Sequence, residues 1–341
     1  MASSYSPETR QNRLTQQWVV CAPERSSRPH RTGSRTPEDS PPTDTPVEGC
    51  PFCPGHEGQL PSVLWEMTAD DDRPWRTRAV PNKFSALSPT SPFPDAAPSL
   101  YRTRPSHGRQ EVIIDTPQHH HPLARMPVGQ IEALLRTYLT RYRTLREDDL
   151  YPFVFRNHGA RAGASISHPH SQIIGTDVPP PRIEREEAAA RRRYEETDQC
   201  PYCEMIDIEL DAERRLVRVT DDFVAFVPFA ARVPYELWIL PRRHEPEMGR
   251  LRGEERTDLA RLLRTVVRRL RTCLDDPDYN FFFRTALASD STASHLHWSL
   301  RLQPRTTVEA GFELSTGMLI NPSIPERDAA VLRGDEPGAP S

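Results

Sequence analysis

The chain has 341 residues, a formal net charge of −4 and 36 prolines. A chain of this length is expected to form two domains, and its near-neutral charge disfavours a nucleic-acid partner held mainly by phosphate contacts. No apolar run approaches the length of a membrane span and the first residues lack the pattern of a secretion signal, so we expect a cytoplasmic protein with no membrane contact.

The N-terminal part of the chain combines a short strand with a basic turn. Residues 17–22 are expected to form the strand, and Arg25 and Arg28 follow it on a tight turn. The turn would aim both guanidinium groups at a common point, but it is equally typical of a solvated basic loop. Residues 29–48 are rich in Pro, Ser and Thr, which predicts a long connection.

Strands and one long helix are expected between this connection and the centre of the chain. Residues 76–86 are typical of a strand that runs into a loop, and the β-branched run at 111–115 predicts a second strand. Residues 129–146 have apolar side chains at spacings of three and four, which predicts an amphipathic helix. Residues 151–155 form an apolar and aromatic run typical of a buried strand.

The stretch from Asn157 to Gln172 carries the strongest functional signal. Its first part is rich in Gly, Ala and Ser, and small side chains let a ligand approach backbone N–H groups, as in loops that bind phosphate. His168, His170 and Gln172 follow at alternate positions, so an extended backbone would point them to one face. Two imidazoles and an amide beside such a loop suggest nucleophilic chemistry at phosphorus. The alternative is a pair of surface histidines in a loop.

The second half of the chain repeats the order of the first half. The matched segments are 50–53 with 200–203, 82–86 with 222–226, 111–119 with 235–244, the helices 129–146 and 258–274, 151–157 with 279–285, and 168–170 with 295–297. Chance is a poor explanation for six matches in one order, so we predict two related units. The predicted domains are a catalytic N-terminal unit at 1–181 and a C-terminal unit at 182–341.

Each unit is rich in strands that are joined mainly by turns, and each contains one long helix. This pattern predicts an α+β fold in which each of the two tandem units is an antiparallel sheet with a long helix. The charged segment at 183–197 is expected to be a solvated helical connector between the units.

Each unit also carries the ligand types of a tetrahedral zinc site, which are two cysteines and two histidines. The first site would be Cys50, Cys53, His119 and His168, with His120 and His121 as competitors for His119. The second site would be Cys200, Cys203, His244 and either His295 or His297. All four ligands would come from the protein, so both sites are expected to be structural. A redox role is the alternative for a Cys-x-x-Cys pair, but no βαβ pattern surrounds either pair.

A metal on His168 would have a consequence for its neighbour. The backbone would then hold His170 beside a fixed point and give its free imidazole the constant orientation that a nucleophile requires. No catalytic metal is needed for this chemistry.

These motifs resemble the histidine-triad superfamily, and their tandem arrangement resembles the galactose-1-phosphate uridylyltransferase family. The resemblance extends from about Trp18 to about Pro325. The segments that carry it are 18–29, 50–53, 81–87, 157–172, 236–244 and 311–317. It implies two tandem histidine-triad-like units and an enzyme of the nucleotidyltransferase class.

The resemblance also implies roles for individual residues. His170 would be the nucleophile that becomes a nucleotidyl-histidine, and Gln172 would hydrogen-bond the transferring phosphate. The other implied substrate-binding residues are Arg25, Arg28, Asn157 and Ser165 at phosphate groups, Asn82 at the nucleoside and Glu313 at the sugar hydroxyls. At the second metal site the family's His-Trp pair favours His297, which precedes Trp298, over His295.

The implied reaction is ping-pong transfer by a UDP-glucose:hexose-1-phosphate uridylyltransferase, with a nucleotide sugar and a hexose-1-phosphate as partners. Ser171 with Gln172, and the segment 315–317, resemble a branch that includes ADP-glucose phosphorylase, which transfers adenylyl groups to phosphate. A histidine-triad nucleotide hydrolase is a further alternative. Two zinc ions are the expected cofactors, with iron as the alternative at the second site, and a homodimer is an expectation from the family.

Overall fold

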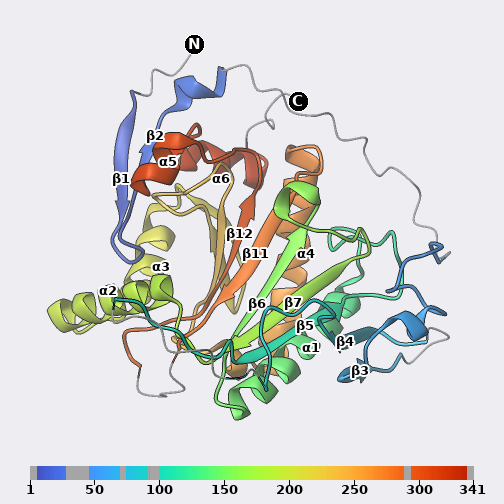
Figure 1. Cartoon of the computed structure of the whole chain (residues 1–341). Helices are drawn as coiled ribbons and strands as arrows, with labels where there is room; N and C mark the ends of the chain where they lie inside the picture. Colours follow the sequence, from blue (N-terminus) through green and yellow to red (C-terminus); the bar gives the residue numbers. More distant parts are fainter. Residues whose placement is uncertain are drawn as a thin grey trace.

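The computed structural model describes residues 6–27, 46–69, 74–90, 92, 100–287 and 293–335. Within these residues, strands from both halves of the chain join in one ten-stranded sheet (Figure 1). In order across the sheet they are β3 (Trp65–Met67), β4 (Thr77–Pro81), β5 (Gly108–Ile114), β7 (His170–Thr176), β6 (Tyr151–His158), β11 (Tyr279–Arg284), β12 (Ser299–Pro304), β10 (Leu237–Pro241), β9 (Phe223–Phe226) and β8 (Leu216–Val219). All neighbours in this sheet pair antiparallel. The predicted connection at 29–48 lies mostly outside the described residues.

The strand order is the same in both halves when it is read outward from the centre of the sheet. β6 and β11 lie side by side at the centre, with Phe155 opposite Phe282 and Asn157 opposite Asn280 (Figure 1). β7, β5, β4 and β3 follow on one side, and β12, β10, β9 and β8 follow on the other. An approximate two-fold axis therefore relates the halves. The sequence predicts the repeat, but it does not predict that the two sheets are continuous.

Two long helices, α1 (Val128–Glu147) and α4 (Gly253–Cys273), pack against each other and cover one face of the sheet. Their apolar side chains, such as Leu134 and Leu263, share the main core with Ile173 of β7. Removing this apolar surface from water is the dominant favourable contribution to folding. Both helices were expected from the spacing of their apolar residues, although α4 begins five residues before the predicted 258.

The segment between the halves forms two helices, α2 (Pro181–Thr197) and α3 (Pro201–Ala212). Each begins with proline, whose fixed φ suits the first helical position. The prediction of a solvated connector at 183–197 is wrong for one face of α2, because Glu186 is only 3% exposed. Its carboxylate lies 3.1 Å from a guanidinium nitrogen of Arg301 in β12.

A three-stranded sheet brings the two ends of the described chain together. It consists of β1 (Glu8–Asn12), β2 (Gln17–Cys21) and β13 (Leu319–Asn321), with β13 parallel to β2. The remaining helices are α5 (Gly311–Thr316), α6 (Pro325–Arg333) and the 3-10 turns η1 (Pro23–Ser27), η2 (Glu57–Gln59), η3 (Ala160–Ala162) and η4 (Met248–Arg250).

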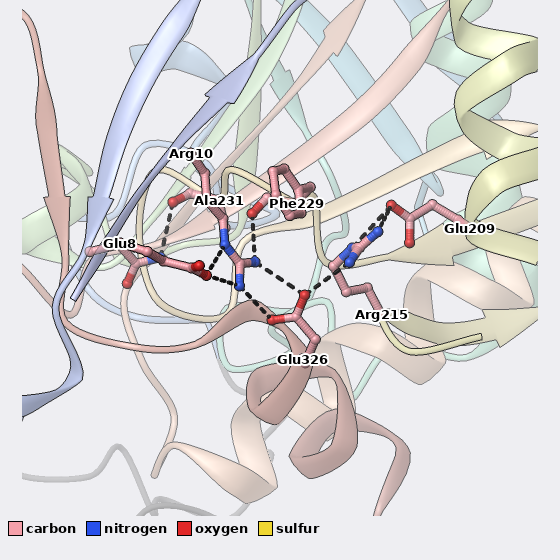
Figure 2. Close-up of polar contacts among 8 residues, drawn as sticks. Glu8, Arg10, Glu209, Arg215, Phe229, Ala231 and Glu326 are labelled. Atoms are coloured by element: carbon pink, nitrogen blue, oxygen red, sulfur yellow. Dashed lines mark hydrogen bonds and ion pairs between the residues drawn. The ribbon is translucent and has the colours of Figure 1, made fainter. Parts of the chain in front are cut away.

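A row of alternating charges attaches β1 to the C-terminal half of the chain (Figure 2). Arg10 in β1 contacts Glu8 and is 3.1 Å from Glu326 at the start of α6. Glu326 is also 2.9 Å from Arg215, which in turn is 2.9 Å from Glu209 of α3. Arg10 and Arg215 are both largely buried, and Glu326 contributes to the compensation of both charges together with Glu8 and Glu209.

The predicted α+β fold, with two tandem units that each combine an antiparallel sheet with a long helix, is confirmed. The division into residues 1–181 and 182–341 stays a prediction. Within the part of the chain that the structure describes, no helix is both long enough and apolar enough to cross a membrane.

The charge row gives a stability prediction. Glu326→Ala removes the carboxylate that Arg10 and Arg215 share but leaves Glu8 and Glu209 as their partners, so it should lower the free energy of unfolding by about 1.5–3 kcal/mol. Asp335→Ala is the control, because it removes only an exposed ion pair with Arg333. Urea unfolding of both variants measures the difference, and equal midpoints would contradict the role given to Glu326.

Asp328 of α6 gives a prediction of pH dependence. Burial raises the pKa of Asp328 to about 7, although hydrogen bonds from Ser323 and the Tyr235 N–H favour the charged form. An aspartate in the unfolded chain has a pKa of about 3.9, so between about pH 4 and pH 7 the folded protein holds a proton that the unfolded chain has lost. The free energy of unfolding should therefore fall as the pH rises through this window.

Asp328→Asn keeps an acceptor oxygen for both hydrogen bonds and cannot ionise. The variant should lose this part of the pH dependence and should unfold at a higher temperature than the wild type at pH 8. Thermal unfolding curves recorded from pH 4 to pH 8 provide the measurement. Parallel curves for the two proteins would show that Asp328 does not titrate as described.

Candidate active site and metal centres

The loop between β6 and β7 is shaped by backbone geometry that requires glycine. Gly159 and Gly163 have positive φ values of 83° and 89°. A Cβ on Gly159 would also lie 2.0 Å from a carboxylate oxygen of Asp278, so this position excludes other residues. The other oxygen of Asp278 accepts a 2.6 Å hydrogen bond from the Arg161 N–H. A residue from the second half of the chain thus holds the loop of the first.

His170 opens β7 at the end of this loop. Its Nδ1 is 2.9 Å from the carbonyl oxygen of His168 and must donate there, because a carbonyl only accepts. The lone pair of Nε2 is therefore free. Burial lowers the pKa of His170, which keeps the ring neutral near pH 7.

A cavity of about 460 Å³ lies over His170. This volume falls within the range of small-molecule sites. Its lining includes His170, Asn157, Ser165 and Arg156 together with the small residues of the loop. The structure therefore brings three of the predicted catalytic and substrate-binding residues, His170, Asn157 and Ser165, to one cavity.

Gln172 lies two residues beyond His170 in β7, on the same face of the strand. Its side-chain oxygen accepts a 3.0 Å hydrogen bond from Gln110 of β5. Ser171 points to the opposite face, where it accepts a 2.5 Å hydrogen bond from the Tyr138 hydroxyl of α1 and donates to Asp115 at 2.9 Å. Ser171 therefore anchors β7 to the helix layer and does not face the cavity.

Arg156 is a site residue that sequence reasoning missed. It is 1% exposed, it pairs with the fully buried Asp115, and it lines the cavity. The motif Phe155-Arg156-Asn157 was recognised only as part of the repeat. Its guanidinium lies on the side of the sheet that carries Ser171 and Asp115, and Asp115 compensates its charge.

Gln172 itself does not line this cavity, and neither do the other predicted substrate-binding residues that the structure describes. Arg25 is exposed on η1, and Arg28 lies outside the described residues. The Asn82 side chain accepts a hydrogen bond from the Phe84 N–H at 2.9 Å. Glu313 accepts one from the Ala310 N–H at 3.0 Å and so caps its own helix, α5.

Four ligand-type side chains meet beside the cavity. The ligand atoms of Cys50, Cys53, His119 and His168 all lie within 4.8 Å of one another. Cys53 Sγ is 3.4 Å from Nδ1 of His119 and 3.6 Å from Nδ1 of His168. His168 Nε2 donates to the Thr116 carbonyl at 2.8 Å, so the Nδ1 lone pair is free to bind a metal ion.

A matching cluster occupies the second half of the chain. Cys200, Cys203, His244 and His297 have ligand atoms within the same 4.8 Å limit. His297 Nε2 donates to the Pro241 carbonyl at 2.9 Å, as His168 does to that of Thr116. The structure brings His297, and not His295, into this cluster. Both groups of four could hold a metal ion.

The register of the strands corrects the matching of the two His-x-His motifs. Phe155 and Phe282 both face away from the main core, so the match of 151–157 with 279–285 is displaced by one residue. Phe155 lies opposite Gln172, and Phe282 lies opposite Arg301. Arg301 therefore takes the place of Gln172, and Ser299 takes the place of His170. The match of 295–297 with 168–170 is displaced by two residues, because His297 corresponds to His168.

The matching position in the second half is buried among the residues that the structure describes. Ser299 is fully buried and accepts a hydrogen bond from Arg301, whose guanidinium lies 4.0 Å from the Trp238 ring centre. Glu186 of α2 compensates the charge of Arg301. The nucleophile position of the second half is thus a serine covered by a helix.

Comparison with known proteins places the chain in a family. A model described as the N-terminal domain of galactose-1-phosphate uridyl transferase matches residues 1–180, and one described as the C-terminal domain matches residues 153–334. The chain belongs to the galactose-1-phosphate uridylyltransferase family. It is therefore a member of a family of nucleotidyltransferase enzymes.

Two curated relatives of this family member span almost the whole chain. This chain is 34% identical to ADP-glucose phosphorylase of Arabidopsis thaliana over 335 residues, which cover 96% of this chain and 93% of the relative. It is 32% identical to galactose-1-phosphate uridylyltransferase of Thermotoga maritima over 342 residues, which cover 96% and 98%. The crystal structure of an Arabidopsis thaliana ADP-glucose phosphorylase with bound ADP-glucose superimposes with a TM-score of 0.81 at 31% identity, covering 96% of this chain and 99% of that one.

The two clusters predict about two bound metal ions per chain. His297→Ala removes a ligand of the second cluster and should reduce the metal content to about one ion per chain. His295→Ala is the matched control, since His295 lies two residues away and outside the cluster, and it should keep both ions. Elemental analysis of purified protein is the measurement. A wild-type content well below one ion, or equal losses in both variants, would contradict the assignment.

Proposed function

We propose that the protein transfers a nucleotidyl group from a nucleotide sugar to a second acceptor through a covalent intermediate on His170. The observation that carries the proposal is the hydrogen bond from His170 Nδ1 to the carbonyl of His168. It leaves the Nε2 lone pair of a buried, neutral imidazole at a cavity bounded by a loop of small residues. A neutral histidine in a fixed orientation is suited to attack phosphorus.

In the proposed first step Nε2 attacks the α-phosphorus of the nucleotide sugar. The bond from phosphorus to the sugar phosphate breaks and hexose-1-phosphate leaves with the electron pair. In the second step an acceptor phosphate attacks the nucleotidyl-histidine and releases Nε2. Asn157, Ser165, Gln172 and the loop N–H groups would hydrogen-bond the phosphate oxygens and stabilise their charge.

Uridylyl transfer from UDP-glucose to galactose-1-phosphate is the first candidate reaction. Adenylyl transfer to phosphate is the second, because the ADP-glucose phosphorylase relative matches the chain as fully as the uridylyltransferase does. Ser171 does not distinguish them, since it faces Tyr138 and Asp115 and not the cavity. A nucleotide hydrolase is the remaining alternative.

We propose that both metal clusters bind zinc. The sulfur-to-nitrogen distances within them are 3.4–3.7 Å. Bond lengths of about 2.3 Å to sulfur and about 2.05 Å to nitrogen give a separation of about 3.6 Å in a tetrahedral zinc site. Iron is the alternative at the second cluster. When bound, the metal supplies a rigid structural link and no reaction step.

The predicted roles of Arg25 at phosphate, Asn82 at the nucleoside and Glu313 at the sugar are part of this proposal. Arg25 and Glu313 do not line the cavity of the single chain. The predicted homodimer is consistent with this placement, because a second copy would supply such residues.

Covalent labelling tests the proposal. Incubation with UDP-glucose or ADP-glucose labelled in the α-phosphate should label the wild type and should not label His170→Asn, which lacks the nucleophile. His107→Asn, at an exposed histidine outside the cavity, is the matched control and should be labelled as the wild type is. Full labelling of His170→Asn would rule out the assignment.

Discharge of the labelled enzyme then separates the candidate reactions. Release as UDP-galactose by galactose-1-phosphate supports uridylyl transfer, and release as ADP by phosphate supports the phosphorylase reaction. Rapid discharge by water without either acceptor would favour the hydrolase and contradict the proposed transfer.

A further inference from the structure

Asn157 and Gln172 can assist phosphoryl transfer only if their amide groups point the correct way. A side-chain amide carries an oxygen that accepts hydrogen bonds and an NH2 group that donates them. The NH2 group stabilises a phosphate oxygen, whereas the oxygen repels it. The orientation of each amide therefore decides whether the residue favours or opposes the reaction.

Gln110 sets the orientation of Gln172. The two side chains are diagonal neighbours on adjacent strands, because Gln110 pairs with Ile174. The backbone N–H of Ala86 can only donate, and it donates to Gln110 Oε1 at 3.2 Å. Gln110 must then turn Nε2 towards Gln172, where it donates to Oε1 at 3.0 Å. The NH2 group of Gln172 is left available on the face of β7 that carries His170.

Asn280 sets the orientation of Asn157 in a similar way, but here the fixed backbone group is an acceptor and not a donor. Its Nδ2 donates to the carbonyl oxygen of Ala162 at 2.8 Å, and a carbonyl can only accept. The second N–H of the same group donates to Asn157 Oδ1 at 2.8 Å. Asn157 Nδ2 is therefore left to donate, and it faces Gly163 of the loop, 3.8 Å from the position of an added Cβ.

We propose that Gln110 and Asn280 are positioning residues that fix the NH2 groups of Gln172 and Asn157 towards the reacting phosphate. The inference rests on the proposed transfer through His170. A backbone group fixes the amide orientation of Gln110 and of Asn280, because a backbone N–H can only donate and a carbonyl can only accept. Asn280 lies on β11, which gives the second half of the chain a part in the reaction although it has no nucleophile of its own.

Gln110→Glu tests the first positioning residue, because it replaces the donor to Gln172 with an acceptor. A carboxylate still accepts from the Ala86 N–H, but it cannot donate to Gln172. Gln172 would turn its NH2 group to the new carboxylate and present its oxygen to the phosphate. Loss of one donor to a developing oxyanion typically costs about 100-fold or more in rate, so we expect His170 labelling to slow by about that factor while KM for the nucleotide sugar changes much less.

Gln110→Met provides a comparison, because a purely structural role of Gln110 predicts the opposite order of labelling rates for the Met and Glu variants. Methionine loses both hydrogen bonds but leaves Gln172 free to rotate, so the labelling rate should fall by less than in Gln110→Glu. A residue needed only for packing or folding would show the opposite order, because glutamate preserves more of the native contacts. That order would overturn the proposal.

A double-mutant cycle separates positioning from the direct charge of the new carboxylate. In a Gln172→Met background, Gln110→Glu has no amide to turn and should slow labelling by less than about 2-fold. The same loss in both backgrounds would show that Gln110 acts by itself and would overturn the proposal. Asn280→Asp, measured alone and with Asn157→Ala, applies the same cycle to the second positioning residue.

The wild type in the same experiment separates this inference from the function on which it rests. The probe is whichever of UDP-glucose and ADP-glucose labels the wild type, used with full-length protein. A wild type that is not labelled by either contradicts the proposed function. A labelled wild type whose rate is unaffected by Gln110→Glu and Asn280→Asp contradicts the positioning roles alone.

Discussion

The arrangement of the site depends on two interactions of His168. Its side chain belongs to the cluster with Cys50, Cys53 and His119, and its backbone carbonyl receives the Nδ1 proton of His170. The first fixes the chain just before β7, and the second fixes the tautomer and direction of the neighbouring ring. Ser171 then secures the opposite face of the same strand to Tyr138. The proposed nucleophile is held from both faces of the sheet before any substrate arrives.

The two halves of the chain use one architecture for different purposes. Both keep a cluster of two cysteines and two histidines, and in both the second histidine donates to a carbonyl near the end of the neighbouring outer strand. Only the first half follows that histidine with an imidazole. The second half has Ser299 there, covered by α2, and instead contributes Asp278 and Asn280 to the loop across the central strand pair. The continuous sheet makes this possible, because β11 lies directly beside β6.

The sequence predicted the features that depend on local pattern. The period of apolar residues located α1 and α4, and the repeated Cys-x-x-Cys and His-x-His motifs indicated two clusters of the right composition. It could not show that β6 and β11 pair, because a pairing between halves leaves no local signature. For the same reason Gln110, Arg156 and Asn280 were missed, since their importance comes only from neighbours distant in sequence. Matching by motif also displaced the second His-x-His by two residues; the His-Trp pair favoured His297 as the metal ligand, and strand register shows the full displacement.

The most direct test of this account asks whether the first cluster controls the reactivity of His170. Cys53→Ala and Cys203→Ala each remove one thiolate, from the first and second cluster respectively. Each variant should lose about one metal ion. The account predicts that His170 is labelled far more slowly in Cys53→Ala than in the wild type, whereas Cys203→Ala retains most of the labelling rate. Equal labelling rates in the two variants would contradict the central claim.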